Sequence, residues 1–306
     1  MEIICDMFVY ENTFKNDEEI RFFVENSEKN YTDQVLDIAN EISGMDHIRF
    51  LTLSGPTCSG KTTTSYILEH EFEKRGLTVK IISIDDFYRN RADIVDDENP
   101  DFESISAIDF PIFKSCVTKI LNGETAMLPI YDFKNGERTG FFPYTPVAHE
   151  IIIFEGIQAI YPEILAILPK DMTKSIFISV ANDVKAYGMF FEKRKIRFYR
   201  RLLRDFLFRS ATPERTLELW HGVVENEEKN IIPNEKNADY LINSFLPYEL
   251  GVIKPYLMNV VSFDFEKKHE KELYDKISSE FENIIEIPSR FVPSDSVFRE
   301  FIGNDS

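Results

Sequence analysis

The run 55-GPTCSGKT-62 has the residue types and spacing of a phosphate-binding loop, G-x-x-x-x-G-K-[ST]. An apolar run over 49–54 precedes it and a helical pattern over 61–75 follows, which is the strand–loop–helix context that the motif requires. Small residues let backbone N–H groups face phosphate oxygens, and the helix N-terminus adds its dipole. The residues expected at the phosphates of a nucleoside triphosphate are Gly55, Thr57, Cys58, Ser59, Gly60, Lys61, Thr62 and Thr63.

Two side chains of this loop have more specific expected roles. Lys61 is expected to bridge the β- and γ-phosphates, and Thr62 to donate its hydroxyl oxygen to Mg²⁺. Glu155 ends the apolar run 151–154 in a Walker-B-like arrangement, from which its carboxylate can reach the ion or its waters. A buried structural acid is the alternative for Glu155.

Asp85 follows another apolar run, 81–84. In open parallel sheets the functional edge lies at the C-terminal ends of the strands, which places Asp85 near the phosphate loop. A carboxylate there can accept the proton of an attacking hydroxyl group. The alternative is a solvated turn or a helix cap, for which Asp is a favoured residue.

A concentrated basic stretch, 193-KRKIRFYRRLLRDFLFR-209, stands out in an acidic chain. On a helix, Arg197, Arg200, Arg201 and Arg204 share one broad face, because they are spaced by three or four or lie side by side. Guanidinium groups suit the charge that spreads over a phosphoryl group during transfer. A solvated basic face paired with acidic residues is the alternative.

These groups need a scaffold, and the alternation of apolar runs with helical patterns predicts an α/β fold with a mainly parallel sheet. The expected strands are 49–54, 79–84, 150–154, 175–180 and 238–243. Residues 18–43 predict one or two helices that pack onto this fold. We therefore divide the chain into an N-terminal helical extension, 1–48, and one phosphate-loop domain, 49–306.

A projecting hairpin is expected over about 131–142. Asn135-Gly136 lies between two short extended segments, and Asn-Gly is the strongest signal for a two-residue turn in which both residues have positive φ. The hairpin is expected to be either a substrate cover or a structural flap.

The composition limits the partners of the protein. The formal net charge of the 306 residues is −18, which argues against nucleic acid and against an anionic membrane surface. Cys5, Cys58 and Cys116 lie far apart, so neither a disulfide framework nor a zinc site is expected. The acidic N-terminus is not a signal peptide, and no apolar run approaches the ~18 residues of a membrane span. We expect a cytoplasmic protein that acts on a small molecule, either as a monomer or as a homo-oligomer.

Taken together, GPTCSGKTT, SIDDFY, PIYDF, IIIFEGI and RFYRRLLRD resemble the uridine kinase and phosphoribulokinase family of phosphate-loop kinases over about 49–245. The segments DENPDFESISAID, 212-TPERTLELW-220, 226-NEEKNIIPNEKNADYLINS-244, 247-PYEL-250 and 292-VPSDSVFREFIG-303 look like those of its bacterial-type nucleoside kinase branch. Members of that branch often carry an extra N-terminal TGS-like domain, in place of which only the helical lead-in is expected here. The resemblance implies a three-layer P-loop fold with an arginine-rich helical lid at about 193–212.

The resemblance also implies individual roles. Asp85 is the general base for a nucleoside 5′-hydroxyl, Lys61 and Arg204 assist the transfer, and Thr62 and Glu155 serve Mg²⁺. Arg209 is expected at the ATP phosphates. The residues expected at the acceptor are Tyr88, Glu103, Tyr131 and Arg201.

Two positions depart from the family pattern. Gly136 stands where pyrimidine-specific uridine kinases have a base-reading His, and Ala211 stands where they have a further lid Arg. The expected activity is an ATP- and Mg²⁺-dependent transfer of the γ-phosphoryl group to the 5′-hydroxyl of a nucleoside, with uridine or cytidine as the first candidates. The alternatives are a kinase for another small alcohol or a sugar phosphate, and a nucleotide-binding regulatory protein without turnover.

Overall fold

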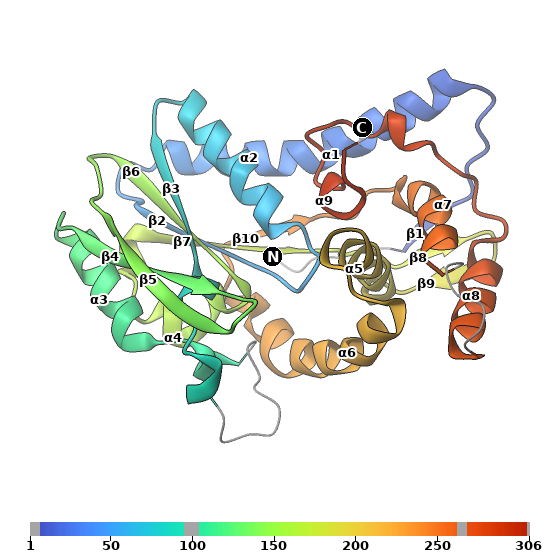
Figure 1. Cartoon of the computed structure of the whole chain (residues 1–306). Helices are drawn as coiled ribbons and strands as arrows, with labels where there is room; N and C mark the ends of the chain where they lie inside the picture. The colour runs from blue at the N-terminus through green and yellow to red at the C-terminus, as the bar shows by residue number, and fades with distance from the viewer. Residues whose placement is uncertain (1–6, 95–103, 262–267, 305–306) are drawn as a thin grey trace.

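The core of the computed structural model, which describes residues 7–94, 104–261 and 268–304, is a five-stranded sheet in the order β10–β7–β2–β6–β3 (Figure 1). Every pairing in this sheet is parallel. Its strands are β2 (Phe50–Ser54), β3 (Thr78–Ser83), β6 (Glu150–Glu155), β7 (Thr173–Ser179) and β10 (Tyr240–Asn243). The α/β fold with a parallel sheet and its five strands are therefore as predicted, with small differences at the strand ends.

The sheet is buried on both faces. Because alternate side chains of each strand point to opposite sides, each face has its own set of apolar residues. Leu51 and Leu53 belong to one apolar core with α1 and α2, while Phe50 and Phe154 belong to another with α3 and α4. The covering helices are α1 (Asp17–Ser43), α2 (Lys61–Lys74), α3 (Phe110–Leu121) and α4 (Pro162–Leu165). The result is the three-layer arrangement, with α1 formed as one continuous helix (Figure 1).

The hairpin consists of β4 (Ala126–Asp132) and β5 (Glu137–Tyr144), so it is longer than the sequence indicated. The prediction of a two-residue Asn-Gly turn was wrong. Residues 133–136 form the connection, and Gly136 has a φ of 72° while Asn135 does not have a positive φ. The Asp132 carboxylate accepts backbone hydrogen bonds from Lys134 and Asn135, and these bonds stabilise the longer turn.

A helical layer lies beyond the C-terminal ends of the sheet strands (Figure 1). In the chain, its first two helices come between β7 and β10, and the others follow β10. Its helices are α5 (Lys193–Arg209), α6 (Pro213–Asn226), α7 (Glu249–Val261), α8 (Lys268–Phe281) and α9 (Arg299–Ile302). A small sheet, β1 (Phe8–Tyr10), β8 (Val184–Ala186) and β9 (Met189–Phe191), packs beside them. The helix α5 coincides with the predicted arginine-rich helix and ends where Ser210 adopts a φ of 54°.

Two of the four arginines expected to face phosphate are instead buried in ion pairs. Arg200 makes a bidentate pair with Glu249 at 2.7 and 2.9 Å, and neither side chain is exposed. Arg197 Nη2 donates to both carboxylate oxygens of Glu227, with each contact at 2.5 Å. The expectation of one shared phosphate-facing surface fails for these two residues, because acidic groups far away in the sequence neutralise them inside the protein.

We expect Glu249→Gln to lower the free energy of unfolding by about 3–5 kcal/mol, because it removes the carboxylate bound directly to the buried Arg200 guanidinium. Denaturant unfolding followed by circular dichroism measures the change. The matched control is Glu218→Gln, which removes an exposed pair with Arg215 and should change stability by about 1 kcal/mol or less. Equal effects of the two substitutions would contradict this account of the buried pair.

Candidate active site

The phosphate loop runs from the end of β2 to the start of α2, in a space that admits no side chain at two of its glycines. A Cβ atom on Gly55 would lie 2.0 Å from the carbonyl oxygen of Ile178 on β7. One on Gly60, whose φ is 91°, would lie 2.4 Å from the Val297 side chain. These close approaches explain why the motif needs glycine at both positions.

The loop curls around the ammonium group of Lys61, which donates hydrogen bonds to the carbonyl oxygens of Gly55 at 3.0 Å and Pro56 at 3.2 Å. Two buried polar atoms near the loop, Ser59 Oγ and Arg204 Nε, have no hydrogen-bond partner among the residues that the structure describes. Buried polar groups are normally paired. A bound phosphate group would supply acceptors for these atoms, so the residues present fit the expected ligand.

Asp85 and Glu155 lie beside one another because β3 and β6 are adjacent strands. Ser83 pairs with Glu155 in the sheet, and Asp85 comes two residues later in the chain. A Cβ atom on Gly156 would lie 3.4 Å from Asp85 Oδ1, so the two strand ends pack closely. The structure thus brings together the two carboxylates that the sequence selected, and Tyr88 donates a hydrogen bond to Asp85 Oδ1 at 3.1 Å.

The electrostatic surroundings of the two carboxylates are similar. Burial raises the pKa of Asp85, and the Lys61 ammonium and the Tyr88 hydroxyl oppose that change. Burial raises the pKa of Glu155 to about 7, the nearby charges of Asp85 and Glu300 add to this effect, and Lys61 opposes it. Lys61 is therefore electrostatically coupled to both acids.

The Thr62 hydroxyl and the Glu155 carboxylate are the groups that fit a magnesium ion. The part of the chain that the structure describes has no cluster of three or more His, Cys, Asp or Glu side chains able to hold a metal. Mg²⁺ usually binds proteins through one or two carboxylates and completes its shell with waters and substrate phosphates. One hydroxyl and one carboxylate next to a phosphate loop match that pattern.

The expected acceptor residues Tyr88 and Tyr131 are in edge-to-face contact, with ring centroids 5.8 Å apart. Both are buried, and the Tyr131 hydroxyl donates to the Arg89 carbonyl at 3.2 Å. Gln158 reaches the Tyr88 hydroxyl at 3.3 Å, a contact that the sequence did not indicate. Glu103 lies outside the described residues.

At Gly136 the space for a side chain is already filled. A Cβ atom there would lie 2.9 Å from Nε and 3.0 Å from Cβ of Arg91, whose backbone N–H donates to the Gly136 carbonyl at 2.7 Å. Arg138 of the hairpin is bound to Asp109 and to the Tyr88 carbonyl, each at 3.1 Å. The space beside Gly136 is thus occupied by Arg91.

The three arginines expected in a lid do not share a single environment. Arg204 reaches Thr57 Oγ1 of the phosphate loop at 3.4 Å. Arg201 pairs with Asp205 at 3.1 Å, and Arg209, whose side chain is 57% exposed, approaches the same carboxylate at 3.5 Å. Ala211 lies beyond the end of α5. Arg204 alone of the three expected lid arginines contacts the loop in the described structure.

The structure adds Glu300, a residue that the sequence did not single out. It lies on α9, and its carboxylate accepts a hydrogen bond from Arg204 at 3.1 Å. The segment 292-VPSDSVFREFIG-303 carried a resemblance signal, but no local pattern in it pointed to the phosphate loop.

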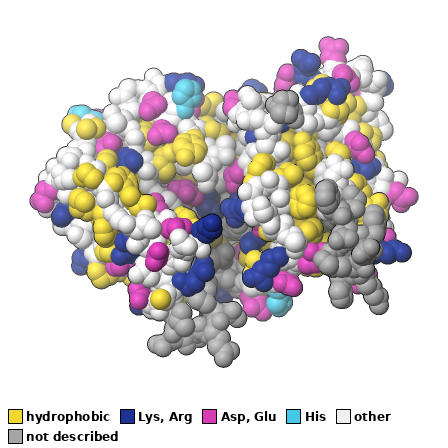
Figure 2. Space-filling model, viewed as in Figure 1, with side chains coloured by type: hydrophobic (Ala, Val, Ile, Leu, Met, Phe, Trp, Pro, Cys, Tyr) yellow, Lys and Arg dark blue, Asp and Glu magenta, His cyan; other side chains and the backbone are white. Residues whose placement is uncertain are grey.

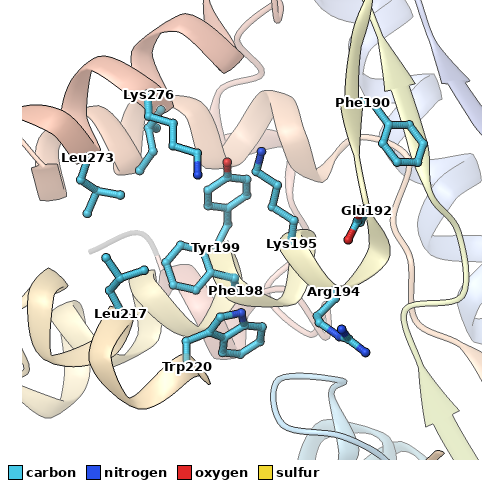
Figure 3. Close-up of a pocket in the computed structure, with 11 residues that line it drawn as sticks. Phe190, Glu192, Arg194, Lys195, Phe198, Tyr199, Leu217, Trp220, Leu273 and Lys276 are labelled. Atoms are coloured by element: carbon cyan, nitrogen blue, oxygen red, sulfur yellow. The ribbon is translucent and has the colours of Figure 1, made fainter. Parts of the chain in front are cut away.

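The face seen in Figure 2 is hollowed between the side of the hairpin and the side of α5 and α6, with Lys, Arg, Asp and Glu side chains around the hollow. A different cavity of about 350 Å³ lies among α5, α6 and α8 (Figure 3). Its walls include Phe198 and Trp220, and none of its lining residues belongs to the phosphate loop. This second cavity is thus separate from the candidate active site.

Comparison with known proteins identifies one family model that covers more than half of the chain. The sequence profile described as "Phosphoribulokinase / Uridine kinase family" matches residues 50–248. A uridine kinase of Deinococcus deserti is 28% identical over 202 residues, which cover 64% of this chain and 88% of that protein. Uridine-cytidine kinase A of Dictyostelium discoideum is 29% identical over 189 residues, which cover 61% of this chain but only 34% of that longer protein.

Among solved structures, one described as a possible uridine kinase from Bacillus stearothermophilus is similar at 17% identity and a TM-score of 0.45. That match covers 69% of this chain and 97% of the other. Within the described residues, no helix combines the length and the apolar character that crossing a membrane requires.

The raised pKa of Glu155 predicts a pH-dependent stability. The folded state favours the protonated form of the Glu155 carboxyl group. Protonation of Glu155 therefore contributes stability that is complete below pH 4.5 and is lost as the pH rises through about 7. Without nucleotide or divalent cations, the wild type should lose about 1 kcal/mol more unfolding free energy than Glu155→Gln between about pH 6 and pH 8. Urea unfolding at each pH tests this, and parallel curves for the two proteins would refute it.

Proposed function

The chain belongs to the phosphoribulokinase/uridine kinase family and is therefore a phosphotransferase with an alcohol group as acceptor; from this premise we propose that it transfers the γ-phosphoryl group of ATP to the 5′-hydroxyl of a nucleoside. The observation that carries this proposal is the position of Asp85 and Glu155 at adjacent strand ends, both coupled to Lys61 of the phosphate loop. The proposed base, the proposed cation ligand and the proposed phosphate-binding ammonium group thus lie within one small region.

In the proposed mechanism, Asp85 accepts the proton of the acceptor hydroxyl as the oxygen attacks the γ-phosphorus, and the bond from that phosphorus to the bridging oxygen breaks, so that ADP leaves. Its ionised form is supported by Lys61 and by the hydrogen bond from Tyr88. Lys61 and Arg204 stabilise the charge on the phosphate oxygens, and most of the rate enhancement comes from positioning and electrostatics. Mg²⁺, held through Thr62 and Glu155, would neutralise charge on the β- and γ-phosphates.

The acceptor proposal rests on the region around Tyr88 and Tyr131. Two buried aromatic side chains next to the proposed base suit a nucleoside. A phosphorylated acceptor would need additional cations, and Arg138 of the hairpin is already paired with Asp109. This pairing makes Arg138 less available to a sugar phosphate. Because Arg91 fills the space at Gly136, we propose that the base is bound without the His of the pyrimidine-specific relatives.

Substitution of the proposed base should separate binding from chemistry. Asp85→Asn is expected to lower kcat by ~10²–10⁴ while ATP affinity stays within a few-fold, because the amide cannot accept the proton. Steady-state kinetics and nucleotide binding measure the two effects. Asp86→Asn is the matched control, because Asp86 accepts the Tyr131 backbone N–H and its amide can keep that bond. Full turnover by Asp85→Asn would exclude Asp85 as the base.

The acceptor class can be tested directly by ADP release with the common nucleosides, with ribulose 5-phosphate and pantothenate included as non-nucleoside alcohols. We expect at least one nucleoside to give turnover well above the rate without acceptor. Turnover with only a non-nucleoside would reject the nucleoside assignment. Tight ATP binding with no turnover of any acceptor would instead support a regulatory nucleotide-binding protein.

A further inference from the structure

The C-terminal segment 292–303 lies directly against the phosphate loop, and α9 is located beside α2 and α5 (Figure 1). Val297 fills the space that a side chain at Gly60 would need. Phe298 and Phe301 are fully buried, and the Arg200 guanidinium lies 5.1 Å from the ring centroid of Phe301. The segment is therefore packed into the same core as α5 and is fixed relative to the loop.

This packing places the Glu300 carboxylate between α5 and α2. Its Oε1 accepts from Arg204 Nη1 at 3.1 Å, and its Oε2 is 3.5 Å from Thr63 Oγ1. The side chains of Arg204 and Glu300 are only 14% and 21% exposed. Glu300 thus joins an expected lid arginine to Thr63 in the first turn of α2.

We propose that Glu300 is a positioning residue for phosphoryl transfer, which holds the Arg204 guanidinium over the phosphate loop so that its remaining N–H groups face the transferred phosphoryl group. This inference rests on the proposed function. Arginine has several flexible side-chain torsions, and fixing them before the substrate binds lowers the entropic cost of using its charge in the transition state.

The geometry favours positioning over obstruction of the phosphate site. Glu300 engages only Nη1 of the guanidinium. Nη2 reaches Thr57 Oγ1 at a long 3.4 Å, and the buried Nε has no hydrogen-bond partner among the described residues. Nη2, which has a second N–H beyond the long Thr57 contact, and Nε, which lies 3.9 Å from Asp205 Oδ1, are thus not used by Glu300. A charge-assisted bond to a partly buried carboxylate is also stronger than a neutral one, so it can hold the arginine in place.

The test is a double-mutant cycle of Glu300→Gln and Arg204→Ala, read as kcat, acceptor KM, ATP affinity and thermal midpoint. Glutamine keeps the shape and removes the charge. We expect Glu300→Gln to lower kcat about tenfold, with acceptor KM within about twofold and the thermal midpoint within a few degrees. In the Arg204→Ala background the same substitution should cause little further loss, because the effect of Glu300 passes through Arg204.

Asp295→Asn is the matched control, since Asp295 is an exposed acid in the same segment, and it should leave kcat unchanged. Independent, additive losses of kcat or an unchanged kcat in Glu300→Gln would overturn the proposal. A faster Glu300→Gln enzyme with higher ATP affinity would also overturn it and would mean that the carboxylate blocks the phosphate site. If the wild type turns over no nucleoside, the proposed function fails. The double-mutant cycle is then measured with the acceptor that the enzyme does use, or as ATP hydrolysis with water as the acceptor.

Discussion

The site depends first on how α5 holds the phosphate loop. Arg197 donates to the Thr57 carbonyl at 3.2 Å and Arg200 donates to the Cys58 carbonyl at 3.3 Å. Both guanidinium groups are buried, and Glu227 and Glu249 neutralise them. Because these bonds fix the loop relative to α5, they also fix it relative to Arg201 and Arg204 on the same helix. Two arginines of the predicted basic face therefore serve to position the others.

The active-site charges also depend on one another. The Lys61 ammonium lowers the pKa values of Asp85 and Glu155, which burial raises. Glu300 adds negative charge near Glu155 while it pairs with Arg204. A triphosphate would enter a region where cations and carboxylates are already close and partly dehydrated, so binding requires little rearrangement of fixed charges. In a chain of net charge −18, this local balance matters more for phosphate binding than the overall sign.

The sequence predicted what short-range patterns encode. The five strands, the loop before α2 and the helix α5 follow from local periodicity and one motif, and the close approach of Asp85 and Glu155 follows from the rule for parallel strand ends. Partners far apart in the chain were not predictable: Glu249 for Arg200, Glu300 for Arg204 and the pairing of β1 with β8. The turn over 133–136 was mispredicted because Asp132 supplies side-chain hydrogen bonds that a two-residue Asn-Gly turn does not have. The division of the chain at 48/49 and the roles of the individual site residues stay predictions.

The central claim is that the phosphoryl group of ATP moves to the 5′-oxygen of a nucleoside. Phosphorus NMR of the product formed from the best nucleoside tests it most directly. The account predicts a phosphomonoester signal coupled to the two protons of the 5′-methylene group, together with an equal amount of ADP. Coupling to a 2′- or 3′-proton, or inorganic phosphate as the only new product, would contradict it.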